Sequence, residues 1–266
     1  MKKYIVSLLW IVLVPCVSPA QSITDSIDSR TVFSELTGIK KKTDKFNLFL
    51  NMHGGFNAKF QDGFQEGAFE MKQLRIEAKG DVNDWLSYRY RQRLNRGNAG
   101  NGNIDNLPTS IDIAGIGVKL NPRFSLFLGK QCTVYGGIEF DLNPIEIYEY
   151  ADMIEYMSNF MTGVNVAFSP IENQQIQFQI LDSRNGSLEE TYGESEFLEA
   201  PKLPLVYTLN WNGNFHNIYK TRWSASVMNE VKGKRMYYYA LGNELTLDKF
   251  GAYFDWMYSR EGIDRK

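Results

Sequence analysis

The sequence predicts an all-β protein, an antiparallel transmembrane β-barrel of which about eleven strands are present. Two observations predict this fold. Segments of alternating apolar and polar residues recur from residue 46 to residue 258, and the connections between them are by turns short and long. Successive side chains of a strand point to opposite faces, so such alternation places one face against lipid and the other toward water.

The first twenty residues have the pattern of a secretory signal peptide. Two lysines precede an apolar run over residues 4–14, and small residues lead up to a cleavage site at Ala20. Cys16 offers a lipoprotein alternative, but the proline directly before it fits a lipobox poorly. We therefore expect residues 1–20 to be a cleaved signal peptide that exports the chain.

The rest of the chain divides into a polar periplasmic lead-in, residues 21–45, and the barrel domain, residues 46–266. After cleavage Cys132 is the single cysteine, which excludes an intrachain disulfide and a thiolate metal cluster. No later stretch approaches the roughly 18 apolar residues of a spanning helix. The net charge of -2 gives no support for nucleic-acid binding.

The barrel domain opens with the longest alternating segment, residues 46–60. The most informative segment lies within residues 85–95, where leucine and tyrosine side chains occupy one face and Arg89, Arg91 and Arg93 the other. An apolar face opposite three arginines is typical of a strand that separates lipid from a water-filled channel. The remaining strand-like segments are 74–79, 114–120, 124–130, 164–168, 175–180, 205–211, 220–227, 237–246 and 254–258.

The connections are sorted by length, as short periplasmic turns and longer external loops are in a transmembrane barrel. Because single-chain bacterial barrels have even strand numbers and an open edge in lipid leaves backbone groups unpaired, eleven strands predict that the sequence is the N-terminal part of a longer barrel. The short connections are 81–84, 121–123, 169–173, 212–216 and 248–249. The others are 97–110, 132–160 and 184–202, which are long, and 61–67 and 229–235, which are modest.

Basic residues recur on the polar face of these segments. In a channel they would raise the local concentration of anions, because a narrow water-filled pore between low-dielectric walls focuses the electric field. The alternative is that they are solvated charges, or a structural network that pairs inward with Glu77 and Glu244. The candidates for the anion path are Arg75, Lys79, Arg89, Arg91, Arg93, Lys119, Lys220 and Arg222.

The longest connection, residues 132–160, is rich in acidic residues and aromatics. If it folds inward, its carboxylates face the arginines and set up a transverse field at a constriction. If it folds outward, it is a solvated extracellular loop, and the sequence leaves both options open. The acidic candidates are Glu139, Asp141, Glu146, Glu149, Asp152 and Glu155.

Signals of catalysis are weak. The sequence contains no G-x-S-x-G elbow and no glycine-rich phosphate loop that opens a helix. The histidines are His53 and His216, and His53 lies on the polar face of the first segment, where a barrel lipid hydrolase could use it. We expect no enzyme activity, no catalytic or metal site and no cofactor.

Three stretches carry a resemblance to a known family. They are L-R-I-E-A-K-G-D-V-N-D-W-L-S-Y-R-Y-R-Q-R-L-N at residues 74–95, the segment ending G-K-Q at residues 129–131, and Y-G-G-I-E at residues 135–139. They resemble the phosphate-selective porin O/P family of outer-membrane porins. The resemblance implies a trimeric, sixteen-stranded anion channel, with Arg89, Arg91 and Arg93 as an arginine ladder and Lys130, near the loop, as a further residue of the anion path. The chain has no dense lysine cluster, so phosphate specificity is not implied.

The leading hypothesis is a porin-like channel in the outer membrane of a Gram-negative-type cell. Its partners would be outer-membrane lipid, small hydrophilic and mainly anionic solutes and, by the resemblance, two further copies of itself. Selectivity would come from the charge and width of the lumen. The alternatives are a non-channel surface or adhesion protein with a blocked barrel, a barrel lipid hydrolase, and a soluble periplasmic β-protein.

Overall fold

The structure is a computed structural model that describes residues 45–97, 104–142, 147, 149–193 and 198–265. The expected signal peptide, residues 1–20, lies outside the described residues, as does the expected lead-in except for Lys45. No helix within the described ranges is long and apolar enough to cross a membrane.

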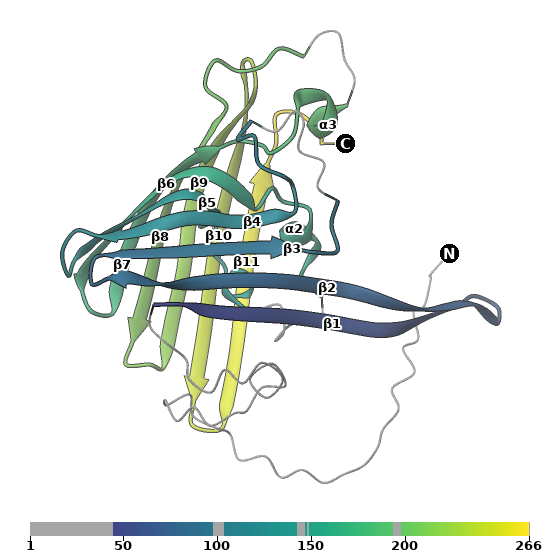
Figure 1. Cartoon of the computed structure of the whole chain (residues 1–266), viewed down its shortest axis with the longest axis horizontal. Coiled ribbons are helices and arrows are strands. Elements are labelled where there is room, and N and C mark those ends of the chain that lie inside the picture. Colours follow the sequence, from purple (N-terminus) through teal and green to yellow (C-terminus); the bar gives the residue numbers. More distant parts are fainter. Residues whose placement is uncertain (1–44, 98–103, 143–146, 148, 194–197, 266) are drawn as a thin grey trace.

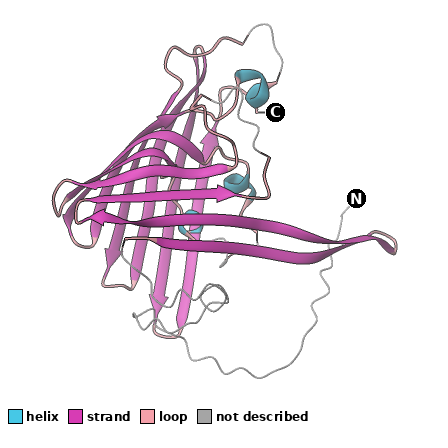
Figure 2. Cartoon of the chain, in the orientation of Figure 1, coloured by secondary structure: helices cyan, strands magenta, loops and turns pink. Residues whose placement is uncertain are grey.

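Eleven antiparallel strands form one curved sheet in which each strand pairs with its neighbours in the sequence (Figures 1 and 2). This confirms the all-β antiparallel architecture. The strands are β1 (Asn47–Phe60), β2 (Phe64–Asn83), β3 (Leu86–Arg93), β4 (Ile111–Lys119), β5 (Phe124–Cys132), β6 (Phe160–Ile171), β7 (Gln174–Asp182), β8 (Leu205–Phe215), β9 (Tyr219–Val231), β10 (Lys234–Leu247) and β11 (Phe250–Arg260). The short helices are η1 (Glu139–Asp141), α2 (Asp152–Glu155) and α3 (Leu188–Tyr192).

The connections at one end of the sheet are all short, whereas those at the other end include three long loops. Residues 61–67 and 229–235 were expected as connections of modest length, and this expectation is wrong. The strands continue almost to the chain reversals, which are tight turns at Gly63 and Gly233 with φ angles of +126° and +77°. The long loops are residues 94–110, 133–159 and 183–204.

Antiparallel pairing assigns every strand residue to one of two faces, because directly opposed residues share a face. We call the face that carries Arg89, Arg91 and Arg93 the inner face. Its polar rows continue around the sheet, as in the row in which Thr208 of β8 hydrogen-bonds Ser226 of β9 at 2.9 Å. The opposite, outer face displays large apolar side chains to the surroundings.

Representative exposed side chains on the outer face come from one end of the sheet to the other. They are Leu50, Met52, Ile116, Val164, Ile176, Phe178, Leu209, Leu241, Phe254 and Trp256. The register confirms that they share one face: the row from Ile176 runs through Trp211, Trp223 and Leu241 to Trp256. A soluble sheet would cover such a surface with a second layer.

One apolar cluster lies on the inner face, beside the long loops. The ring of Tyr135, from the loop after β5, meets that of Tyr238 in β10 at 5.1 Å between centroids, in an edge-to-face arrangement. Methionines and small aliphatic side chains of β6 to β10 complete the cluster. The loop is thereby anchored to the sheet by burial of apolar surface. The buried members are Tyr135, Met161, Leu181, Val206, Met228, Met236, Tyr238 and Ala240.

Gly129 of β5 should be intolerant of any side chain. Its φ is +118°, and a Cβ atom there would lie 2.8 Å from the Cα of Gly115 in β4. We expect Gly129→Ala to destabilise the sheet by about 1–3 kcal/mol, because L residues are strained in this conformation. The measurement is the fraction of protein with folded gel mobility before heating, together with the unfolding temperature. Gly251→Ala is the control, since open space surrounds that position. Equal behaviour of the two variants would contradict the prediction.

Candidate functional site

A charged cavity of about 600 Å³ lies on the inner face, between β1–β4 and the loop after β5. Seven basic and four acidic side chains line it, so positive charge is in excess. Seven of the residues expected from the sequence are among them, five basic and two acidic. The basic residues are Lys72, Arg75, Lys79, Arg89, Arg91, Arg93 and Arg96, and the acidic ones are Glu77, Asp112, Asp141 and Glu155.

The strand register brings like charges together in this wall. Arg75 of β2 lies opposite Arg93 of β3, and Lys79 lies opposite Arg89. Like charges at opposed positions are destabilising, so the wall needs carboxylates between them. Glu77 is one: its Oε1 lies 2.8 Å from Arg89 Nε and 3.9 Å from Lys79 Nζ. This is part of the structural pairing that the sequence left as an alternative.

Asp112 is the second carboxylate. Both of its oxygens lie 3.0 Å from Arg93 Nε, and one is 3.3 Å from Arg91 Nε. The side chain is 1% exposed. This buried aspartate therefore holds two arginines of the ladder in fixed positions, because a buried charge requires a close partner.

A β-bulge accounts for the direction of Asp112. Strict alternation from Ile113 would place it on the outer face. The register, however, shifts between Arg91, which pairs with Ile113, and the next residue of β3, which pairs with Ile111. Asp112 is left over as the extra residue and turns inward. For this reason Asp112 is not among the residues expected from the sequence. The one signal of the bulge in the sequence was an acidic residue at a position that alternation assigns to the apolar outer face.

Arg75 differs from its neighbours. It is 7% exposed, and its Nε has no hydrogen-bond partner within the described part of the chain. Its neighbours Lys79, Arg89, Arg91 and Arg93 each form an ion pair with Glu77 or Asp112. Arg75 is therefore less closely engaged by carboxylates than these four neighbours on β2 and β3.

The described residues of the loop after β5 contact the inner face of the sheet and line the opposite side of the cavity. Asp255 of β11 accepts hydrogen bonds from the backbone N–H groups of Ile138 at 2.8 Å and Glu139 at 2.9 Å. Ser224 of β9 donates to the carbonyl oxygen of Tyr135. These contacts attach the described part of the loop to inner-face residues of β9 and β11, which favours the inward arrangement among the two that the sequence left open.

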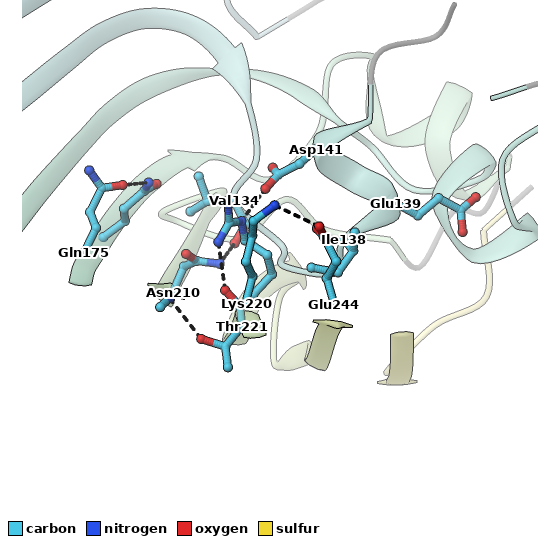
Figure 3. A network of polar contacts seen from close by, with 12 residues as sticks. Val134, Ile138, Glu139, Asp141, Gln175, Asn210, Lys220, Thr221 and Glu244 are labelled. Atoms are coloured by element: carbon cyan, nitrogen blue, oxygen red, sulfur yellow. Dashed lines mark hydrogen bonds and ion pairs between the residues drawn. The ribbon is translucent and has the colours of Figure 1, made fainter. Parts of the chain in front are cut away.

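Arg222 of β9 also holds this loop, whereas the neighbouring Lys220 is engaged within the sheet. Arg222 forms an ion pair with Asp141, and Lys220 Nζ lies 2.8 Å from Glu244 Oε1 of β10 (Figure 3). Asn210 of β8 donates to the carbonyl oxygen of Val134 at 3.3 Å, which fixes the start of the loop (Figure 3). Lys220 and Arg222 thus lie on the inner face as expected, but each is engaged by a carboxylate.

The acidic candidates of the loop have different environments. Asp141 and Glu155 line the cavity. Glu139 accepts a hydrogen bond from the backbone N–H of Ala151 at 2.6 Å, and Glu149 and Asp152 are exposed and absent from the cavity lining. Glu146 lies outside the described residues.

Tyr150 contributes an aromatic ring to the cavity wall. Its hydroxyl donates to the carbonyl oxygen of Leu142 at 3.0 Å. Burial raises the pKa of Tyr150, against the opposing effect of Arg75 and Arg91. The hydroxyl therefore remains neutral at physiological pH.

Lys130 was expected near the anion path, and the structure shows that this is wrong. It pairs with Ala114 and Thr162, which places it on the outer face in line with Leu126 and Leu128. Its side chain is 1% exposed, and Nζ lies 2.9 Å from Asp105 Oδ2 in the loop after β3. Thr162 Oγ1 donates to the same oxygen at 2.8 Å. The alternation over residues 124–130 already assigned this parity, so the resemblance to a family motif was the misleading signal.

Lys119 lies on the inner face, where it pairs with Ser125 at the short-turn end of the sheet. It is exposed and does not line the cavity. No group of three or more potential metal-ligating side chains occurs among the residues that the structure describes.

The model of the family "Phosphate-selective porin O and P" matches residues 46–266. No curated protein sequence matches significantly.

Solved structures resemble this chain over much of its length. OccAB3 of Acinetobacter baumannii has a TM-score of 0.45 and 13% identity, with 84% of this chain and 60% of that one covered. A BenF-like porin of Pseudomonas fluorescens Pf-5 has a TM-score of 0.42 and 14% identity, with 82% and 58% covered. OpdK of Pseudomonas aeruginosa, solved with vanillate, has a TM-score of 0.40 and 14% identity, with 83% and 60% covered. The chain thus spans about 60% of the length of these structures.

Removal of the Asp255 carboxylate should release the loop from β11. We expect Asp255→Ala to weaken this attachment by about 2–4 kcal/mol, because two hydrogen bonds to a charged acceptor are lost. The readout is amide hydrogen exchange at Ile138 and Glu139, with limited proteolysis of residues 133–159. Asp248→Ala, in an exposed short turn, is the control. Unchanged exchange in a folded Asp255→Ala protein would show that the carboxylate does not hold the loop.

Lys130→Met should destabilise the protein by about 3–5 kcal/mol, because it leaves Asp105 buried without its cation. A second substitution, Asp105→Leu, should restore most of the stability. Burial disfavours ionised Asp105, but hydrogen bonds from Lys130, the Leu107 N–H and Thr162 lower its pKa overall. Its contribution is therefore present above the ordinary aspartate pKa of about 3.9 and is lost as pH falls through the lowered value. Unfolding midpoints in denaturant across this pH range provide the measurement. Wild-type stability of the single variant would argue against the pair.

Proposed function

Because this chain belongs to the phosphate-selective porin O and P family, we propose that it forms the wall of an outer-membrane channel through which small hydrophilic solutes diffuse passively, with a preference for anions. Residues 1–20 would direct export, residues 21–45 would be periplasmic, and residues 46–266 would lie in the membrane. The outer face would meet lipid and the inner face water.

The observation that carries the proposal is the excess of basic side chains around the inner cavity. Basic groups on a low-dielectric wall concentrate anions, and the field is strongest where the path is narrow. Acidic Asp141 and Glu155 on the loop side face this wall across the cavity. Such opposed charges would orient a solute with a negative end toward the strands.

The ion pairs refine which groups attract the solute. Arg91 and Arg93 share Asp112, and Arg89 is paired with Glu77, so much of the charge of the ladder is balanced locally. Arg75 would then contribute more to anion attraction than the three arginines of the ladder. Because a phosphate-specific site needs several converging unpaired donors, we propose general anion preference. A homotrimer is the assembly that the family resemblance implies.

A second candidate is a surface protein with a blocked barrel. The inward loop and the apolar cluster around Tyr135 favour it, since both occupy space on the inner face. Single-channel recordings in planar bilayers separate the two candidates. Stepwise conductance supports the channel, and its absence for folded, inserted protein supports the surface protein.

Substitutions of Arg75 and Asp112 should shift ion selectivity in opposite directions. We expect Arg75→Gln to lower, and Asp112→Asn to raise, the chloride-to-potassium permeability ratio by about two- to fivefold, the effect of one unit charge near a wet path. Reversal potentials under a salt gradient give the ratio. Lys249→Gln, in an exposed short turn, should leave it unchanged. If neither variant changes the ratio, the cavity is not on the conduction path.

A further inference from the structure

A second cavity, of about 880 Å³, lies at the long-loop end of the sheet. It is formed where the β9–β10 turn meets residues 201–203 and residues 260–262. Strand residues in its lining include Asn229, Arg235 and Tyr237. All three lie on the outer face, because Arg235 pairs with Asn229, and Tyr237 pairs with Val227 and Arg260. This groove is therefore on the other side of the sheet from the charged inner cavity.

Hydrogen bonds fix the walls of the groove. Asn229 Nδ2 donates to the carbonyl oxygen of Leu203 at 3.0 Å, and the Lys232 N–H donates to that of Glu199 at 2.9 Å. On the other side, the Gly262 N–H donates to Glu230 Oε2 at 2.8 Å. Both flanking segments are thus attached to β9, and the groove between them is a preformed feature.

The groove is strongly basic. Its lining contains five basic residues and one acidic residue, Glu261. Lys232 forms an ion pair with Glu199 outside the lining. The other four are exposed, and no ion pair engages them among the described residues. These four unpaired groups are Lys202, Lys234, Arg235 and Arg260.

The outer face below the groove changes character in steps along β10 and β11. Leu241 pairs with Trp256, and one step nearer the groove Tyr239 pairs with Tyr258. All four side chains are exposed by 39–47%. The next pair toward the groove is Tyr237 with Arg260, and Arg235 lies one pair beyond it, opposite Asn229. This order of apolar, tyrosine and basic levels matches the order of acyl chain, interface and headgroup in a membrane leaflet.

We propose that this groove binds the phosphate-bearing headgroup of a lipid in the outer leaflet. Arg235 and Arg260 would bind phosphate oxygens, since guanidinium groups form paired hydrogen bonds with phosphate. Lys202 and Lys234 would add attraction at the rim. The acyl chains would lie along Tyr239, Tyr258 and the apolar pairs below. The inference rests on the proposed membrane location, but concerns a site separate from the conduction path.

The test is lipid binding by purified full chain in neutral detergent, measured by native mass spectrometry. The probe is phosphatidic acid, which carries a phosphate monoester, and phosphatidylcholine is the reference lipid. We expect wild-type protein to prefer phosphatidic acid. Arg235→Gln/Arg260→Gln should weaken its binding about 30-fold, since each basic residue near a charged headgroup contributes about fivefold.

The matched control is Arg123→Gln/Lys249→Gln, which removes the same charge from exposed short turns at the opposite end of the sheet. Equal loss in both double variants, or no preference for phosphatidic acid, would overturn the proposal. Displacement by inorganic phosphate at equal concentration would also overturn it, in favour of a free-anion site. Should Arg235→Gln/Arg260→Gln lack folded gel mobility, Lys202→Gln/Lys234→Gln provides the same comparison with an expected loss of similar size.

Conductance of the same preparations keeps this proposal distinct from the channel proposal. We expect Arg235→Gln/Arg260→Gln to conduct like wild type while it loses the lipid. Absence of conductance in every preparation would refute the channel, whereas selective lipid loss would still support the headgroup site.

Discussion

Cross-strand pairing between neighbouring antiparallel strands decides which side chains meet on the inner face, and the charged wall depends on it. Pairing of β2 with β3 sets Arg75 opposite Arg93 and Lys79 opposite Arg89. Repulsion in such a wall would oppose strand association. Glu77 and Asp112 reduce this repulsion through their ion pairs, and the same two carboxylates therefore determine how much positive charge the wall keeps.

The loop after β5 is the second wall of the site, and its position depends on the far side of the sheet. Asp255 and Arg222 hold it through hydrogen bonds and an ion pair, and Tyr135 adds buried apolar contact. The cavity is therefore bounded by strands at one end of the sequence and by a loop that strands at the other end keep in place. Charge on the loop and charge on the strands are held at a fixed separation.

Much of the fold could be predicted from the sequence, because the period of two is a local signal that survives along each strand. The alternation of residues 86–94 predicted the faces of Arg89, Arg91 and Arg93 correctly. Strand ends were less accurate, since tight turns such as that at Gly233 leave few residues outside the strands. The site was predicted in part. The direction of the loop depends on partners such as Asp255, which lies more than a hundred residues away. No local pattern reports such a contact.

The two errors at the site have opposite causes. Lys130 was misplaced because a family motif was given more weight than the alternation of residues 124–130. That alternation assigns Lys130 correctly to the outer face. Asp112 was missed because parity was applied through a position where one extra residue interrupts it. A polar residue at a position of the apolar face thus has two physical explanations. Another segment can bury and pair with it, as the loop that carries Asp105 does with Lys130, or a bulge can turn it toward the inner face.

The bulge at Asp112 also separates the charge of the inner face from the hydrophobicity of the outer face, two properties that regular alternation couples. In a regular strand, every second residue points to the inner face, so an acid can be added there only by replacing one of these residues. In β4 these are the positions in line with Ile113, which pairs with Arg91 of β3. An extra residue adds the acid and leaves both series intact, so the outer face of β4 keeps its hydrophobicity. In a sheet of this kind, the charge of the inner face and the hydrophobicity of the outer face can then vary independently, through single-residue insertions and deletions as well as substitutions.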